Sequence, residues 1–204
     1  MSEPRFELSG GRLCLDFSNT VSDWFAEPRR DRLEDYGALV AFAEQAGAID
    51  PRQARALRRV AGQRPTEAEA AVVRARELRQ AIFHVFHALG HGGRVTDADV
   101  ETINAFLGRA RRRLRREAGG WRLDFERDGA DLEAPLSPIA VSAAELLTST
   151  RADRVRICGA EETGCTWLFV DESKNRSRRW CSMSDCGNRA KARRHYEKLS
   201  GRAP

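Results

Sequence analysis

Residues Trp180-Cys181-Ser182-Met183-Ser184-Asp185-Cys186-Gly187-Asn188-Arg189 decide the fold of the last quarter of this chain. Two more cysteines, Cys158 and Cys165, precede this stretch, so that six residues separate the first pair, fifteen the middle pair and four the last pair. A zinc ion prefers four soft or borderline ligands in a tetrahedron, which two cysteine pairs separated by a loop supply. The spacing predicts one structural zinc ion, bound by Cys158, Cys165, Cys181 and Cys186.

Two other roles for these cysteines fit the sequence less well. Cysteines that only fill a core would recur at helix or strand spacing among Leu, Ile and Val, whereas glycine, serine and aspartate flank these four. Disulfides require export, and the opening residues 1–5 contain acidic and proline residues with no long apolar run behind them. We therefore expect a cytoplasmic protein whose thiols are free to bind metal.

Three segments around the second cysteine pair resemble the CGNR zinc finger, a family named for its last cysteine and the three residues after it. They are Trp167–Ser173, Asn175–Met183 and Cys186–Lys191. The front of the chain, Gly10–Thr20, is similar to the helical ABATE domain, which precedes this finger in proteins described as stress-induced transcription regulators. The chain departs from the finger family at Gly159–Gly164, which form a longer loop than usual. The resemblance implies a zinc-dependent, DNA-binding regulator of transcription in the stress response.

The pattern of the chain predicts a mainly α fold with small antiparallel β elements, divided into two unequal domains. We expect a helical, ABATE-like sensor or regulatory domain in residues 1–150 and a treble-clef-like zinc finger in residues 151–204. Helical spacing and cap residues predict five helices, which cover Leu33–Ala43, Pro51–Ala61, a long helix with a capping box at Thr66–Glu69 that ends near Gly90, Thr96–Leu107 continuing into Arg109–Arg116, and Pro138–Leu147.

Strand signals are shorter. The opening segments Phe6–Leu8 and Leu13–Phe17 predict a strand pair or an extended arm. Leu114–Glu117 and Trp121–Phe125, separated by two glycines, predict a small antiparallel sheet, and Asp128-Gly129 marks a further turn. In the finger we expect a hairpin that carries the first cysteine pair at its turn, followed by the second pair and a helix.

Positive charge is concentrated in the finger. Residues 151–204 hold thirteen Lys or Arg against seven Asp or Glu, a net charge of +6, whereas residues 1–150 carry −1. A basic surface beside a rigid frame favours a polyanion. The candidate nucleic-acid contacts are Lys174, Arg176, Arg178, Arg179, Arg189, Lys191, Arg193 and Arg194. The alternative is a solvated face, or arginines that pack against Trp167, Trp180 and acidic groups. For Asn188, a backbone-bracing role is preferred to a base contact.

Two groups of polar residues in the N-terminal part are candidate binding sites. Asp16, Asn19 and Thr20 are candidates for a small-molecule ligand pocket, although capping and bracing are the commoner role of such residues. His84, His87 and His91 share one helical face and form a candidate second metal site, but histidines near a helix C-terminus are more often favoured by the helix dipole. The sequence contains no nucleophile elbow, phosphate-binding loop or dinucleotide motif, so we expect no enzyme activity.

The sequence therefore favours a DNA-binding regulator whose zinc is a scaffold and whose helical part senses an effector or forms a homodimer. No apolar stretch approaches the length of a membrane helix, so we expect no membrane partner. The alternative is a zinc-stabilised protein-interaction module that does not bind nucleic acid.

Overall fold

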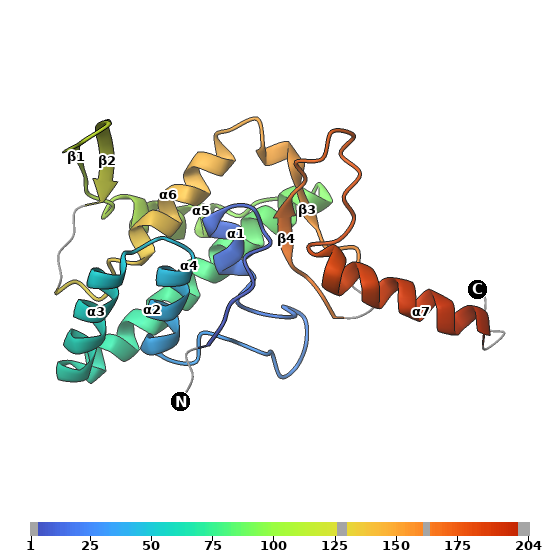
Figure 1. Ribbon diagram of the computed structural model, residues 1–204, viewed down its shortest axis with the longest axis horizontal. Coiled ribbons are helices and arrows are strands. Elements are labelled where there is room, and N and C mark those ends of the chain that lie inside the picture. Colours follow the sequence, from blue (N-terminus) through green and yellow to red (C-terminus); the bar gives the residue numbers. More distant parts are fainter. Residues whose placement is uncertain (1–3, 126–129, 161–163, 200–204) are drawn as a thin grey trace.

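The computed structural model describes residues 4–125, 130–160 and 164–199 (Figure 1). The fold is mainly α with two small antiparallel sheets, as predicted. In chain order the elements are α1 (Leu13–Ser18), α2 (Tyr36–Gln45), α3 (Pro51–Gln63), α4 (Pro65–His91), α5 (Asp97–Leu107), β1 (Arg112–Glu117), β2 (Gly120–Phe125), α6 (Leu136–Leu147), the 3-10 turn η1 (Ala152–Arg154), β3 (Val155–Ile157), β4 (Leu168–Val170), the π-helical turn η3 (Met183–Gly187) and α7 (Asn188–Leu199).

The 27-residue helix α4 is the central element of the molecule. It packs against α1, α2, α3, α5 and α6 and, at its C-terminal end, against the hairpin of β3 and β4. Its buried residues recur at helical spacing on the sides that face these partners, because alanine at Ala71 and Ala75 permits close approach while Ile82 and Phe86 fill the core. Within the described residues no helix is long and apolar enough to cross a membrane.

Helix starts follow the capping signals at two sites and depart from them at a third. The Asp50 side chain accepts hydrogen bonds from the first-turn amides of α3, and the Thr96 hydroxyl caps α5, both as predicted. The predicted capping box at Thr66–Glu69 is wrong, because α4 begins one residue earlier at Pro65 and Arg64 precedes it without a side-chain cap. Proline suits this first position because its missing N–H would be unpaired there anyway.

The segment Leu13–Phe17 is a helix and not the predicted strand. The carbonyl of Arg12 accepts hydrogen bonds from the amides of Leu15 and Asp16 and so starts α1. Every residue of α1 after Leu13 is buried, so the apolar pattern carries no period that would distinguish a helix from a strand. The preceding residues 4–9 form neither a helix nor a strand, and the Gly10 carbonyl accepts a hydrogen bond from the amide of Val170.

The predicted continuation of the helix into Arg109–Arg116 is also wrong. α5 ends at Leu107, and Arg112–Glu117 form β1, which pairs antiparallel with β2 in the sheet that the two glycines predicted. Consecutive arginines have good helix propensity but pair readily across a hairpin turn when apolar residues alternate with them. The predicted turn at Asp128-Gly129 lies outside the described residues.

Strand β4 is buried on both faces and joins two cores. Leu168 and Val170 pack into the large core formed by the helices, whereas Phe169 points to the other side, into a smaller core with Trp167 and the four clustered cysteines. Alternation along a strand produces this division, because successive side chains point to opposite faces. The finger hairpin is therefore part of the hydrophobic core of the helical region.

The Asn19 side chain fixes this hairpin to α1. Its amide nitrogen donates to the carbonyl of Leu168, and its oxygen accepts from the amide of the same residue, both at 2.9 Å. Nearby, the Trp167 indole donates to the carbonyl of Val21, and the Trp24 amide donates to the Thr166 hydroxyl. Asn19 thus satisfies backbone groups that the two-stranded sheet leaves unpaired in a buried position.

We expect Asn19→Ala to lower the free energy of unfolding by about 2–4 kcal/mol, because two buried backbone groups lose their partner. Chemical denaturation of the zinc-loaded protein measures this change. Asn104→Ala, at an exposed asparagine of α5, is the control and should change stability by no more than about 0.5 kcal/mol. Equal effects of the two substitutions would contradict the role given to Asn19.

Candidate metal centre

The sulfur atoms of Cys158, Cys165, Cys181 and Cys186 all lie within 4.8 Å of one another, and all four cysteines are buried. Sγ of Cys181 lies 3.7 Å from that of Cys165 and 3.6 Å from that of Cys186. A zinc tetrathiolate with bonds of about 2.3 Å has sulfurs about 3.8 Å apart, and a disulfide would need about 2.05 Å. The spacing of the sulfurs is that of metal ligands.

The four thiols titrate as a coupled group. Hydrogen bonds from Cys165 and Cys181 lower the pKa of Cys158 to about 2, and donating those bonds raises the pKa of both donors. Burial raises the pKa of Cys186. One thiolate therefore keeps the protons on its neighbours, and four thiolates in this volume require a divalent cation to offset their charge.

The first knuckle, Cys158–Cys165, begins where β3 ends. The Cys158 amide donates to the carbonyl of Trp167 at 2.8 Å, which closes the hairpin behind the cysteine. The next amide, of Gly159, donates to the carbonyl of Arg179 at 2.7 Å. A Cβ at this position would lie 3.0 Å from that carbonyl oxygen, so a larger residue would push the two segments slightly apart. The glycine beside the first cysteine therefore connects the two knuckles.

The second knuckle is the π-helical turn η3. The Ser182 hydroxyl accepts from the amide of Asp185, and the Ser182 carbonyl accepts from the amide of Gly187, so the chain turns tightly between its two cysteines. The Cys181 amide donates to Sγ of Cys158 at 3.4 Å. Helix α7 starts directly after this turn, at Asn188, whose side chain donates to the Ser184 carbonyl. Asn188 thus braces the backbone, the role preferred from the sequence.

Arg178 is a brace of the second knuckle rather than a free cation. Its guanidinium donates to the carbonyls of Trp180, Cys181 and Ser9, and it lies 4.4 Å from the centroid of the Phe169 ring. These hydrogen bonds occupy its donors inside the protein, and the role of Arg178 as a nucleic-acid contact stays a prediction.

Asp171 organises the loop that leads to this knuckle, a role that sequence analysis missed. It is fully buried and accepts hydrogen bonds from the amide and hydroxyl of Ser173 and from the amide of Arg178. Burial acts to raise the pKa of Asp171, but these hydrogen bonds outweigh it and lower the pKa below its ordinary value. The sequence signal was an aspartate directly after a buried strand, which is typical of a turn that the side chain caps.

Comparison with protein-family models matches residues 11–150 to ABATE, described as "Putative stress-induced transcription regulator". The chain belongs to the ABATE family. Residues 154–198 of this ABATE protein match the CGNR zinc finger, so both resemblances predicted from the sequence are confirmed. No curated protein matches the chain significantly.

The CGNR match and the sulfur geometry together fit one structural zinc ion in this ABATE protein. Four thiolates from these cysteines would fill every position around the metal, which would offset part of their charge and hold both knuckles in place, as in structural sites where protein supplies all the ligands. Arg189 of the family signature also contributes, because its guanidinium donates to Sγ of Cys186 at 3.2 Å. A cation beside a ligand sulfur offsets part of the excess negative charge of the centre.

Some of the remaining predicted nucleic-acid residues form ion pairs or ring contacts within the protein, and others form no ion pair among the described residues. Arg189 pairs with Asp185 at 3.2 Å and Arg193 with Glu197 at 2.8 Å, while Arg179 lies over the Trp180 ring. Among the predicted nucleic-acid residues, those that are exposed and form no ion pair within the described part of the chain are Lys174, Arg176, Lys191 and Arg194.

The candidate ligand-pocket residues of the N-terminal motif lie in internal hydrogen bonds. The Asp16 carboxylate accepts from the amide of Gly10, and burial raises its pKa to about 6. The Thr20 hydroxyl donates to the Phe17 carbonyl and accepts from Arg79, a buried arginine whose guanidinium pairs with both carboxylate oxygens of Asp31. With Asn19 on the β4 backbone, all three residues brace the fold.

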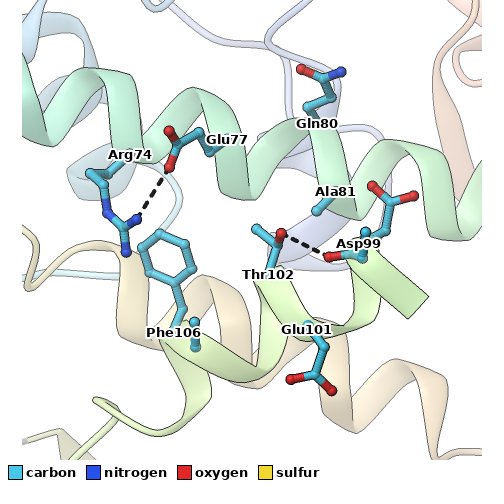
Figure 2. A pocket seen from close by; sticks show the side chains of 10 residues that line it. Arg74, Glu77, Gln80, Ala81, Asp99, Glu101, Thr102 and Phe106 are labelled. Carbon is cyan, nitrogen blue, oxygen red and sulfur yellow. Dashed lines mark hydrogen bonds and ion pairs between the residues drawn. The ribbon is translucent and has the colours of Figure 1, made fainter. Parts of the chain in front are cut away.

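Three surface cavities have walls formed by other residues. One, of about 490 Å³, lies between α4 and α5, where Arg74 pairs with Glu77 and covers the Phe106 ring (Figure 2). A second, of about 500 Å³, lies between α2 and the start of α4. A third, of about 310 Å³, adjoins the metal centre and is lined by Glu7, Ser22, Arg30, Arg32, Gly164, Cys165, Trp167, Asp185, Cys186 and Arg189.

The three histidines of α4 are divided between two environments. Nδ1 of His84 lies 3.1 Å from a carboxylate oxygen of Asp99 on α5. His87 and His91 contact each other, with ring centroids 4.5 Å apart, and His87 also packs on Phe83. In the described part of the chain, the four cysteines form a group close enough to share a metal ion, and the three histidines do not.

Replacing a ligand cysteine should remove the metal. We expect Cys186→Ser to reduce the zinc content from one ion per chain to near zero, because three thiolates bind zinc far more weakly than four. Cys14→Ala is the control, since Cys14 is buried in the helical core with a pKa raised to about 12 and lies apart from the cluster. Elemental analysis after gel filtration measures both. Full zinc in Cys186→Ser, or its loss from Cys14→Ala, would contradict the assignment.

Replacing the brace should weaken metal binding without touching a ligand. We expect Arg178→Ala to lower zinc affinity about 10- to 100-fold, because the carbonyls that orient the second knuckle lose their donor. Competition with a chromophoric chelator measures this affinity. Lys174→Ala removes an exposed charge from the same loop and should leave the zinc affinity unchanged. Equal zinc affinities in the two variants would contradict the bracing role of Arg178.

Proposed function

We propose that this protein is a zinc-dependent, non-enzymatic regulator of transcription in the cytoplasm, and that its finger contacts DNA. Zinc binding and membership of a family described as regulators rest on the family match and the cysteine cluster. The step to DNA is carried by one observation, the cationic surface of α7 beside a metal-fixed knuckle.

The geometry of α7 supports this proposal. The helix projects from the body of the molecule and packs mainly against η3, so its sides are open to solvent (Figure 1). Lys191 and Arg194 are exposed on it, three residues apart and therefore on neighbouring positions of the helix surface. Lys174 and Arg176 add charge from the loop before the second knuckle. Mobile cations on a rigid frame suit phosphate contacts, which set affinity without reading sequence.

A second candidate function is a protein-interaction module, favoured by apolar residues on the same helix. Tyr196 and Leu199 of α7 are 70% and 71% exposed and lie three residues apart, so they are neighbours on the helix surface. On this alternative α7 docks on a protein partner by its apolar side, and the cations only keep the free helix in solution.

We also propose that the helical part carries the sensing role that the family description implies. The cavity beside the metal centre has Arg30, Arg32 and Arg189 in its wall against the carboxylates of Glu7 and Asp185, and this excess of guanidinium groups favours an anionic small molecule. Because its wall also includes Cys165 and Cys186, a ligand there would act directly on the knuckles. A homodimer stays a prediction that analytical ultracentrifugation tests.

Salt titration of DNA binding distinguishes the two functions. We expect the zinc-loaded protein to bind random duplex DNA with a linear dependence of log K on log salt, and Lys191→Ala/Arg194→Ala to reduce the slope by about 0.9 for each lost phosphate contact. The control is Arg55→Ala/Arg59→Ala, which removes two exposed charges from α3. No binding by the parent protein, or equal slopes in both double variants, would overturn the DNA-binding finger and favour the protein-interaction module.

A further inference from the structure

The β1–β2 hairpin is a second basic projection, separate from the finger. Residues 109–125 contain seven arginines against Glu117 and Asp124, a net charge of +5, although residues 1–150 together carry −1. The hairpin stands out from the helical body at the end of the long axis opposite to α7 (Figure 1). Its charge is therefore concentrated on a surface that the finger does not share.

One face of this hairpin combines cations with exposed apolar groups. Leu114 lies opposite Leu123 and Arg116 lies opposite Trp121, so these four side chains share a face. Leu114 is 66% exposed, Trp121 72% and Leu123 53%, whereas side chains of this size usually find cover within the fold. An exposed tryptophan opposite an arginine therefore indicates a surface that binds a partner.

The arginines divide into anchors and free cations. Arg109 pairs with Glu133 at 2.7 Å and Arg112 with Glu145 at 3.0 Å, which ties the base of the hairpin to the helical body. On the opposite face Arg115 pairs with the buried Asp124 at 3.1 Å. Within the described residues Arg113 and Arg116 are exposed and form no ion pair. The hairpin is thus held at its base, and it presents exposed cations without ion pairs on both faces, at Arg116 near the turn and at Arg113 nearer the base.

We propose that this hairpin is a nucleic-acid contact surface, in which Trp121 stacks on an exposed base and Arg116 opposite it binds a phosphate, while Arg113 adds a cation from the other face of the hairpin. Arg113 and Arg115 lie on one face of β1 and Arg112 and Arg116 on the other, so the strand is cationic on both faces. Arginine matches phosphate geometry better than lysine, and all seven cations here are arginine. Aromatic rings interspersed with cations are the usual platform for single-stranded nucleic acid.

Two other occupants suit the hairpin less well. A second copy of the chain packed on the same face would bring like charges together. A membrane would require apolar residues at the tip, where the chain instead has Glu117, Ala118 and two glycines, and a carboxylate opposes approach to anionic lipid. Both are outcomes of the test below.

The test uses the full-length, zinc-loaded chain and a labelled oligodeoxythymidylate of about 20 nucleotides, long enough for an ordinary single-strand site. We expect Trp121→Ala to weaken binding about ten-fold or more, and Trp121→Phe to retain most of the affinity, because phenylalanine still stacks. We expect Arg113→Ala/Arg116→Ala to reduce the salt slope by about 0.7 for each lost contact. Arg55→Ala/Arg59→Ala is the matched control and should leave the slope unchanged.

The outcomes separate this surface from the finger. Hairpin substitutions that weaken binding in the parent chain and also in the Lys191→Ala/Arg194→Ala background support the hairpin, whether or not the finger binds DNA. Affinity and slope equal to those of the control overturn it. Two other results would also overturn the proposal. In one, the hairpin substitutions abolish binding to phosphatidylserine vesicles but leave oligonucleotide binding unchanged. In the other, the parent chain is a dimer that Trp121→Ala dissociates. Because all the altered side chains are exposed, circular dichroism and thermal melts should match the parent chain.

Discussion

Four cysteine thiols packed within 4.8 Å of one another are the constraint on which the C-terminal quarter depends. Four thiolates in so small a volume repel one another, and a divalent cation bound between them would offset that repulsion. The segment has few apolar residues of its own, and its small core consists of the cysteines with Trp167, Phe169 and Ala160. Metal binding therefore supplies folding free energy that apolar burial cannot supply here.

The metal-bound segment is nevertheless continuous with the helical body. Strand β4 contributes Leu168 and Val170 to the core of the helices and Phe169 to the core around the cysteines. Asn19 pairs with both backbone groups of Leu168, and Arg178 connects the second knuckle to the N-terminal arm at Ser9. Because one strand packs into both cores, a displacement of β4 would alter the packing of the helices and of the cysteine cluster together. This shared strand is a physical basis for coupling between the two parts.

Arginine serves several purposes in this chain, and charge alone does not distinguish them. Arg79 is buried and pairs with Asp31, and Arg178 donates to three carbonyls. Arg113 and Arg116 in the hairpin are exposed and form no ion pair within the described residues. The basic composition of the finger identified a cationic region, but only the contacts show which cations remain available to a partner.

The sequence by itself determined the zinc ligands, because cysteine spacing and the residues after Cys186 are local signals. It also determined the helix starts at Asp50 and Thr96, where a side chain caps its own backbone. Only the tertiary structure decided that Leu13–Phe17 is a helix, since complete burial removes the pattern that separates helix from strand. It alone assigned Asn19 to β4 and Arg178 to the knuckle, because their partners are distant in sequence and no local rule brings them together.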